Sequence, residues 1–260
     1  MLIDNGAEIT GAISGAALGL VLAGPPGAIA GAALSPVVST VLKKIGENVS
    51  NNILGPREKI KVGATYALAL EEISTRLANG ESPREDGFFE ASGNDRSSAE
   101  TILEGTLLKS RDEHEEKKLK FYSHFLANLT FDSDVTFYHA NTLLKIAEQL
   151  SYRQLCIIAL FKTKGQVEMK KWGKTFNQTD EVQKYRDFYY ELMNLYDKQI
   201  LKEYGGISMS TKNGELSLLG ISLYNLMNLN QIEGADINEV DETMESIDEI
   251  SNPEKDNNKS

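Results

Sequence analysis

Cysteine is nearly absent from this sequence of 260 residues: there is one, together with one tryptophan, three histidines and six prolines. A single cysteine excludes an intramolecular disulfide framework and any zinc site built from several cysteines. The formal net charge of −11 argues against non-specific binding of the whole molecule to DNA. A chain of this length can bury a core without disulfides, as one large domain or two small ones.

Sequence motifs of common enzymes are also missing. There is no G-x-x-x-x-G-K-[ST] phosphate loop, no G-x-S-x-G and no H-E-x-x-H. The histidines, His114, His124 and His139, are expected to be ordinary surface or core-edge residues. We therefore expect a protein that is not an enzyme and that uses no metal and no cofactor.

Charge is absent between Glu8 and Lys43, over a run of 34 residues. As a continuous helix this run would be about 51 Å long at about 1.5 Å per residue, whereas a bilayer core is about 30 Å thick. One membrane span fits within the run and two do not. A secretory signal explains the run poorly, because the residues before it contain acids and no lysine or arginine.

Glycines in this run repeat at intervals of four residues, so they share a helix face and would let helix backbones pack closely. These candidate helix-packing residues are Gly11, Gly15, Gly19, Gly27 and Gly31. Pro25 and Pro26 form a candidate hinge, because proline kinks or breaks a helix. The pattern favours residues 1–44 as a membrane-inserting segment, either one kinked span or a hairpin of short helices. The alternative is a buried glycine-rich hairpin in a soluble protein.

Residues 45–150 are predicted to be a helical body that mediates oligomerisation. A connector over 45–56 leads to a helix over 57–79, whose apolar residues recur at helical spacing. Residues 81–95 have the composition of a loop, in which the Phe88–Phe89 pair anchors against the body.

A capping box at Ser97 and Glu100 opens the next helix. We expect this helix to run to Leu129 and to carry the charged stretch 111–118 on a solvated face, with ion pairs three or four residues apart. Ser133 or Asp134 is expected to cap the following helix, and Ser151 the one after it.

Residues 151–232 show a different pattern. An aromatic amphipathic helix is predicted over 180–203, and Asn213-Gly214 is a strong signal for the two-residue turn of a β-hairpin. Helix, helix, hairpin and helix together describe a winged-helix-like module. It contains eleven basic and eight acidic residues, which is a weak excess for a reader of duplex DNA.

Lysines and aromatic residues alternate within this module, an arrangement in which lysines can meet phosphates while bases stack on rings. The candidate residues for binding an anionic ligand or oligonucleotide are Lys162, Lys164, Lys170, Lys171, Trp172 and Lys174. The alternative is a solvated loop in which Trp172 fills the edge of the domain.

The last segment, residues 233–260, has ten acids and two lysines and so carries −8 of the net charge of −11. It has few large apolar residues and no aromatic ones, which predicts an acidic, largely disordered tail. Within it, residues 233–250 have the composition of a marginal helix that would form on a partner.

Two stretches resemble helical domains of bacterial abortive-infection proteins of the Abi-alpha type: residues 116–129, which end in Leu-Ala-Asn-Leu, and residues 147–155, which contain Gln-Leu-Ser. With the glycine repeat, the sequence also resembles the membrane effectors of the Hailong anti-phage defence system. The resemblance implies a self-assembled ion channel or pore that stays closed until phage infection. It further implies tetramers kept closed by a single-stranded DNA oligomer or nucleotide bound to the soluble part, and a partner nucleotidyltransferase.

The sequence therefore predicts a mainly α protein with a glycine-repeat membrane segment, a helical body, a winged-helix-like module with one β-hairpin, and an acidic tail. We expect a homo-oligomeric anti-phage effector in the inner membrane, with its soluble body in the cytoplasm. One competing interpretation is a winged-helix DNA-binding regulator with a membrane-associated N-terminal arm. Another is a passive membrane-anchored adaptor whose tail recruits partners.

Overall fold

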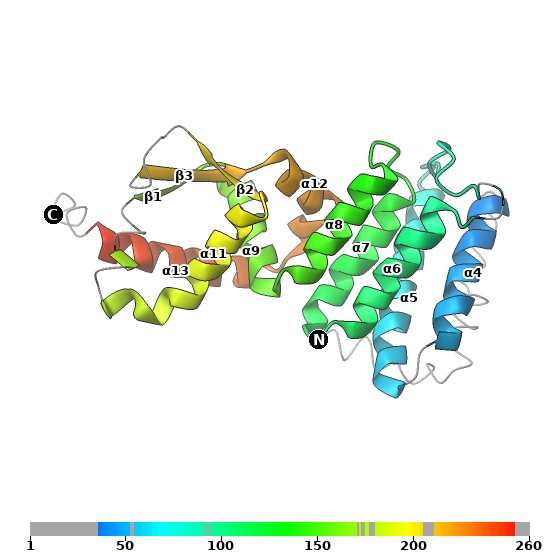
Figure 1. Cartoon of the computed structure of the whole chain (residues 1–260), viewed down its shortest axis with the longest axis horizontal. Coiled ribbons are helices and arrows are strands. Elements are labelled where there is room, and N and C mark those ends of the chain that lie inside the picture. The colour runs from blue at the N-terminus through cyan, green and yellow to red at the C-terminus, as the bar shows by residue number, and fades with distance from the viewer. Residues whose placement is uncertain are drawn as a thin grey trace. The chain divides into compact units, whose positions relative to one another are not determined.

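The computed structural model describes residues 36–52, 55–91, 93, 95–170, 172, 175–176, 180–204 and 211–252. Over these residues the protein is mainly helical, with a small three-stranded antiparallel sheet, which confirms the predicted fold class at this level (Figure 1). The chain divides into two compact units, residues 1–149 and 150–260. The glycine repeat and Pro25-Pro26 lie outside the described residues.

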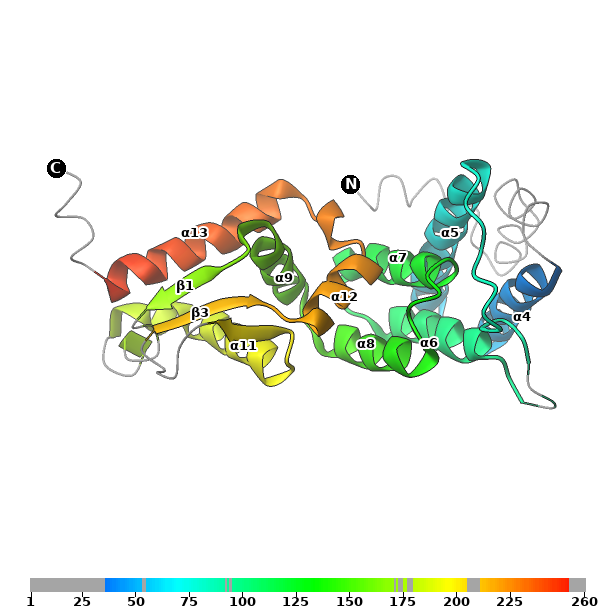
Figure 2. The ribbon, with the colours of Figure 1, turned by 90° about the horizontal axis from the view of Figure 1, so that it is seen from above.

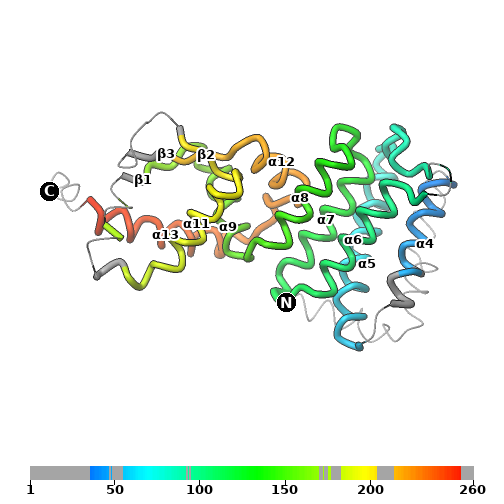
Figure 3. Tube along the Cα trace, viewed as in Figure 1, coloured from blue at the N-terminus to red at the C-terminus, as the bar shows by residue number. Residues whose placement is uncertain are grey.

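The first unit is built from helices. They are α4 (Pro36–Asn52), α5 (Pro56–Ala78), α6 (Ser98–Asp112), the 3-10 turn η1 (Glu116–Lys118), α7 (Leu119–Leu129) and α8 (Phe137–Gln149). The longest, α5, packs against α6 and α7, while α4 and α8 each pack against α6 (Figure 3). The core contains large side chains from three of these helices, among them Tyr66, Leu103 and Phe125.

Helix α4 covers residues for which the sequence predicted a membrane-inserting segment and a connector. Residues 36–44, which we placed in the membrane-inserting segment, form its first half, and the predicted connector over 45–56 is helical as far as Asn52. Its apolar stripe is buried, including Val38 and Ile45. The hydroxyl of Tyr66 donates a hydrogen bond of 2.8 Å to the carbonyl of Leu42. Within the described residues, α4 is the first element of this helical unit.

The capping box of α6 is confirmed. The Ser97 hydroxyl accepts from the backbone N–H of Glu100 at 3.1 Å, and the Glu100 carboxylate accepts from the N–H of Ser97 at 2.9 Å. The predicted loop before it is also confirmed, with Phe88 and Phe89 buried. Thr136, rather than Ser133 or Asp134, lies at the start of α8, where its hydroxyl accepts from the N–H of His139 at 3.3 Å.

The expected single helix from Ser97 to Leu129 is wrong, because the helix stops at Asp112. Glu113 has extended backbone angles (φ −65°, ψ 132°), and its carboxylate accepts from the N–H groups of His114 at 2.8 Å and Glu115 at 2.9 Å. The same carboxylate lies 2.5 Å from the Lys118 ammonium, and both side chains are almost fully buried. The charged stretch is thus not a uniformly solvated face.

The second unit surrounds the apolar helix α9 (Tyr152–Lys164), which Ser151 caps as predicted. Its other elements are β1 (Val167–Lys170), η2 (Asp180–Tyr185), α11 (Arg186–Asp197), β2 (Leu201–Tyr204), β3 (Thr211–Leu216), α12 (Leu218–Leu226), η3 (Leu229–Gln231) and α13 (Gly234–Ser251). The strands lie in the order β1-β3-β2, all antiparallel. Helix α9 packs against α11, α12, α13 and β3.

The predicted hairpin turn at Asn213-Gly214 is wrong, because both residues lie inside β3. Gly214 pairs with Val167 of β1 on one side and with Glu203 of β2 on the other. A Cβ atom at this glycine would lie 2.2 Å from the Tyr196 hydroxyl. Glycine is therefore needed here for close packing beneath the sheet and not for a turn.

The aromatic helix predicted over 180–203 is shorter than expected. It begins as η2, continues as α11 and ends at Asp197. Gln199 then has a positive φ of 59°, and the chain enters β2 with Ile200 and Leu201 buried. The turn at Gln199 redirects the backbone from the helix into the sheet.

Helix α13 (Gly234–Ser251) coincides with the marginal helix expected over 233–250, so the acidic segment is more ordered than the largely disordered tail predicted for 233–260. Helix α13 has an apolar stripe, including Val240, Met244 and Ile247, that is buried in the second unit. Figure 2 shows α13 running beside α9 and β1, which it also contacts. Its partner is thus its own chain, and residues 253–260 lie outside the described residues.

Candidate functional site

The residues singled out for anionic-ligand binding are in different environments. Lys162 is exposed on α9, with its ammonium 5.8 Å from the centre of the Tyr224 ring. Lys164 forms an ion pair with Asp241 of α13. Trp172 is only 2% exposed, so its ring does not offer a surface on which bases can stack.

The side chains of the other three lysines of that set, Lys170, Lys171 and Lys174, lie outside the described part of the structure. Lys170 ends β1, but its side chain lies outside the description, as do the whole of Lys171 and Lys174. The structure therefore brings Lys164 and Trp172 to one place and leaves the other members of the set unplaced or apart.

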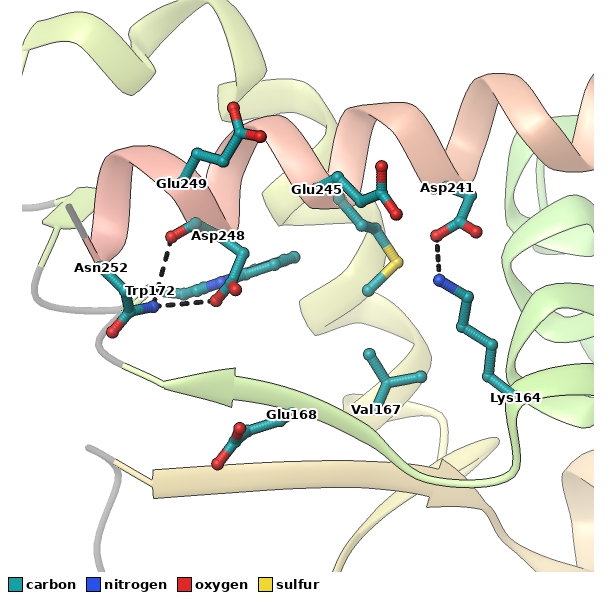
Figure 4. A pocket seen from close by; sticks show the side chains of 10 residues that line it. Lys164, Val167, Glu168, Trp172, Asp241, Glu245, Asp248, Glu249 and Asn252 are labelled. Carbon is teal, nitrogen blue, oxygen red and sulfur yellow. Dashed lines mark hydrogen bonds and ion pairs between the residues drawn. The ribbon is translucent and has the colours of Figure 1, made fainter. Parts of the chain in front are cut away.

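That place is a recess of about 410 Å³ in the second unit. Its walls come from the end of α9, from β1, from Trp172 and from one face of α13 (Figure 4). The described residues that line it are Lys164, Val167, Glu168, Trp172, Asp241, Met244, Glu245, Asp248, Glu249 and Asn252. A volume of this size is typical of small-ligand pockets.

The recess is strongly acidic. Among the described residues that line it, five side chains are carboxylates and one, Lys164, is an ammonium, which gives these residues a formal charge of −4. Asp241 is engaged by Lys164, and Asp248 accepts a 2.8 Å hydrogen bond from the amide of Asn252. Glu245 and Glu249 form no ion pair with any described residue. The site therefore suits a cation better than the anionic ligand predicted for its lysine and tryptophan.

Sequence reasoning missed this site because the helix expected over 233–250 was assigned to a separate partner, so its acids were not placed beside Lys164 and Trp172. Asp241, Glu245 and Asp248 are spaced four and three residues apart, a pattern that places them on one helix face. That spacing, next to the apolar stripe of Val240, Met244 and Ile247, is an amphipathic helix signal present in the sequence.

Two groups of polar side chains in the described part of the first unit contain histidine. Glu113, His114 and Glu115 lie close enough together to be considered as metal ligands. The Glu113 carboxylate, however, is already bound by the Lys118 ammonium and by two backbone N–H groups. His124 shares a 2.5 Å hydrogen bond with Glu72 through its Nδ1 and is buried.

An apolar hollow of about 410 Å³ lies at the start of α4. It is lined by Pro36, Val37 and Val41 together with Phe89 and other residues, and Val37 is 48% exposed. Among the described helices, none combines the length and the apolar character required to cross a bilayer.

Comparison with known proteins gave no match: no family model, no curated protein and no solved structure is significantly similar to this chain. The resemblance to anti-phage membrane effectors is therefore a prediction from the residues that carry it.

Proposed function

We propose that this protein is an anti-phage membrane effector that assembles into a homo-oligomeric pore and depolarises the cell on infection. The observation that carries the proposal is the uncharged run that begins at residue 9, of which residues 36–42 lie in α4, packed on α6. We propose residues 9–35 of this run as the inserting segment. At about 1.5 Å per residue such a segment is roughly 40 Å long as a helix, which is enough for one span of the bilayer core.

Assembly in the membrane is supported by the glycine spacing. Gly11, Gly15 and Gly19 fall on one helix face, where small residues let neighbouring helices pack closely in lipid. Pro25-Pro26 would divide the segment into a kinked span or a short hairpin. The helical body would hold the copies together on the cytoplasmic side, as the tetramers of the effectors that this sequence resembles would require.

Ligand control is the second part of the proposal. The resemblance adds a single-stranded DNA oligomer or nucleotide, made by a partner nucleotidyltransferase, that keeps the pore closed. Such a ligand acts by binding the closed assembly more tightly than the open one. Of the two lysines of that set whose side chains are described, Lys162 is exposed and suits this role better, because Lys164 forms an ion pair with Asp241.

The test is membrane potential in bacteria that express the full chain, beside a version lacking residues 1–35. We expect depolarisation with the full chain, at once or after phage infection if a ligand holds the pore closed, and none with the truncated chain. Gly15→Leu should abolish depolarisation because it adds bulk to the glycine face. Ala17→Leu is the matched control, since it adds bulk about 200° around the helix. Equal depolarisation by well-expressed Gly15→Leu would refute the pore.

A second candidate function is favoured by the topology of the second unit. The described elements follow one another along the chain in the order α9, β1, α11, β2 and β3. The three strands form a sheet of order β1-β3-β2, an arrangement compatible with a winged helix. A DNA-binding regulator of this class would bind duplex DNA with an affinity that falls steeply as salt rises. Absence of duplex binding by the full chain at low salt would remove this candidate.

A further inference from the structure

We infer that the acidic recess between α13 and β1 is a binding site for a short basic peptide segment of a protein partner. Lysine or arginine side chains would bind its carboxylates, and a peptide carbonyl would accept a hydrogen bond from the Trp172 indole. This inference does not depend on the proposed pore, because it rests only on described residues of the second unit.

The first support is the charge of the recess. The described side chains that line it have a formal charge of −4 around a volume of about 410 Å³. Glu245 and Glu249 are exposed and have no cationic partner among the described residues, whereas Glu168, at the edge of the recess, points away from α13 on the other side of β1 (Figure 4). Like charges in one concavity repel each other and attract a ligand of opposite charge.

The second support is the position of the acids on α13. The carboxyl end of a helix carries a partial negative charge and is stabilised by basic side chains. Helix α13 has no basic residue in its last turn, and instead Asp248 and Glu249 lie close to its end at Ser251. These acids oppose the helix dipole, and a bound cation at this point would relieve that repulsion.

The third support is independent of charge. The indole N–H of Trp172 is buried and has no hydrogen-bond acceptor in the described part of the chain. An unpaired buried donor costs about 1–3 kcal/mol, so a ligand that supplies an acceptor is favoured. Figure 4 shows the Trp172 ring below α13, among the side chains that line the recess.

These observations together select a peptide over a simple polyamine. A protonated polyamine brings cations but no acceptor for the indole, whereas a basic peptide brings both. In an extended peptide, alternate residues lie about 6.5–7 Å apart on one side, which is close to the spacing of successive turns of a helix, about 5.4 Å. A Lys-x-Lys sequence can therefore place two ammonium groups along the carboxylates of α13.

The experiment uses the full chain in non-ionic detergent and the fluorescence of Trp172, which is the only tryptophan. The probes are Ac-Lys-Ala-Lys-NH₂, its neutral counterpart Ac-Gln-Ala-Gln-NH₂, and 1,5-diaminopentane, which has two ammonium groups and no carbonyl. We expect the lysine peptide to change the fluorescence saturably, to bind more weakly at high salt, and to bind more tightly than the diamine. The glutamine peptide should have no effect.

Matched variants locate the site. Glu245→Gln/Glu249→Gln should weaken binding of the lysine peptide roughly tenfold, since two partly exposed ion pairs are lost. Glu233→Gln/Glu239→Gln makes the same change in net charge at the far end of α13 and should leave binding unchanged. Calorimetric titration of both variants provides a readout that does not depend on the tryptophan.

Three results would overturn the inference. The first is no saturable binding of the lysine peptide. The second is equal loss of binding in the two double variants, which would indicate only general attraction to an acidic protein. The third is binding of the diamine as tight as that of the peptide, which would assign the recess to small polycations instead.

Discussion

Replacement of Lys118 by methionine tests whether the buried ion pair holds the break between α6 and α7. The side chains of Lys118 and Glu113 are 2% and 4% exposed, and their charged atoms lie 2.5 Å apart. Loss of one partner from a buried pair costs about 3–5 kcal/mol, because the other charge stays desolvated. For a unit of this size that corresponds to a fall in Tm of roughly 10 °C.

The pH dependence of this variant distinguishes a lost charge pair from lost packing. Burial by itself raises the pKa of Glu113, but Lys118 and the N–H groups of Glu115 and His114 together hold it below its ordinary value. Without Lys118 the raising effect of burial dominates, so the folded variant binds a proton more readily than the unfolded chain. The variant should therefore gain stability as the pH falls from about 7 towards 5, whereas the parent should not.

The assay is urea and thermal unfolding of the full chain followed by circular dichroism, with hydrogen exchange of α5–α7 to localise the effect. Trp172 fluorescence reports the second unit, which should be unchanged. Arg57→Met is the control, because the Arg57–Glu116 pair is on the surface, with Arg57 76% exposed, and its loss should cost about 0–1 kcal/mol. A cost for Lys118→Met as small as that of Arg57→Met, with no pH dependence, would refute the reasoning.

Two further predictions concern stability. Gly214→Ala should destabilise the second unit by about 1–3 kcal/mol, because the added Cβ would lie 2.2 Å from Tyr196 and 2.7 Å from Phe161. Gly234→Ala is the control and should be neutral, because the added Cβ would meet nothing within 4 Å. The measurement is urea unfolding followed by Trp172 fluorescence, and equal midpoints for the two variants would contradict the prediction for Gly214. Hydrogen bonding to Arg84 lowers the pKa of Asp86, and Lys44 and Ser97 hold that of Glu100 below its usual value despite burial. Their stabilisation is complete above the unfolded values of about 3.9 and 4.3 and is lost as the pH falls through the lower folded values, so Tm should drop mainly below about pH 4. A Tm that is flat from pH 5 to pH 3 would count against these pairs.

Local signals in the sequence predicted the helices that depend on local chemistry. The capping residues Ser97 and Ser151 start α6 and α9 because a side-chain oxygen and a backbone N–H three residues later are all that the cap requires. The apolar spacing of α5 was equally clear, and Gly80, with φ of 87°, follows its end. None of these features needs knowledge of the rest of the fold.

Features that depend on distant contacts were missed. Asn213-Gly214 has the composition of a turn, but its glycine is required by Tyr196 and Phe161, which come from other elements. Glu113 ends α6 because it is buried with Lys118, and burial of a charged pair cannot be read from spacing. The apolar residues of α4 were absorbed into the uncharged run before Lys43, since a body helix and a membrane helix share the same composition there.

The acidic recess was missed for a related reason, and its energetics connect it to the rest of the second unit. Helix α13 is held by an apolar stripe against α9, while its recess face carries acids that repel one another and oppose the helix dipole. A basic ligand that binds only the packed helix stabilises that packing by RT ln(1 + [L]/Kd). Occupancy of the recess and docking of α13 are thus linked in both directions, so any partner that removes α13 from α9 must also release the ligand.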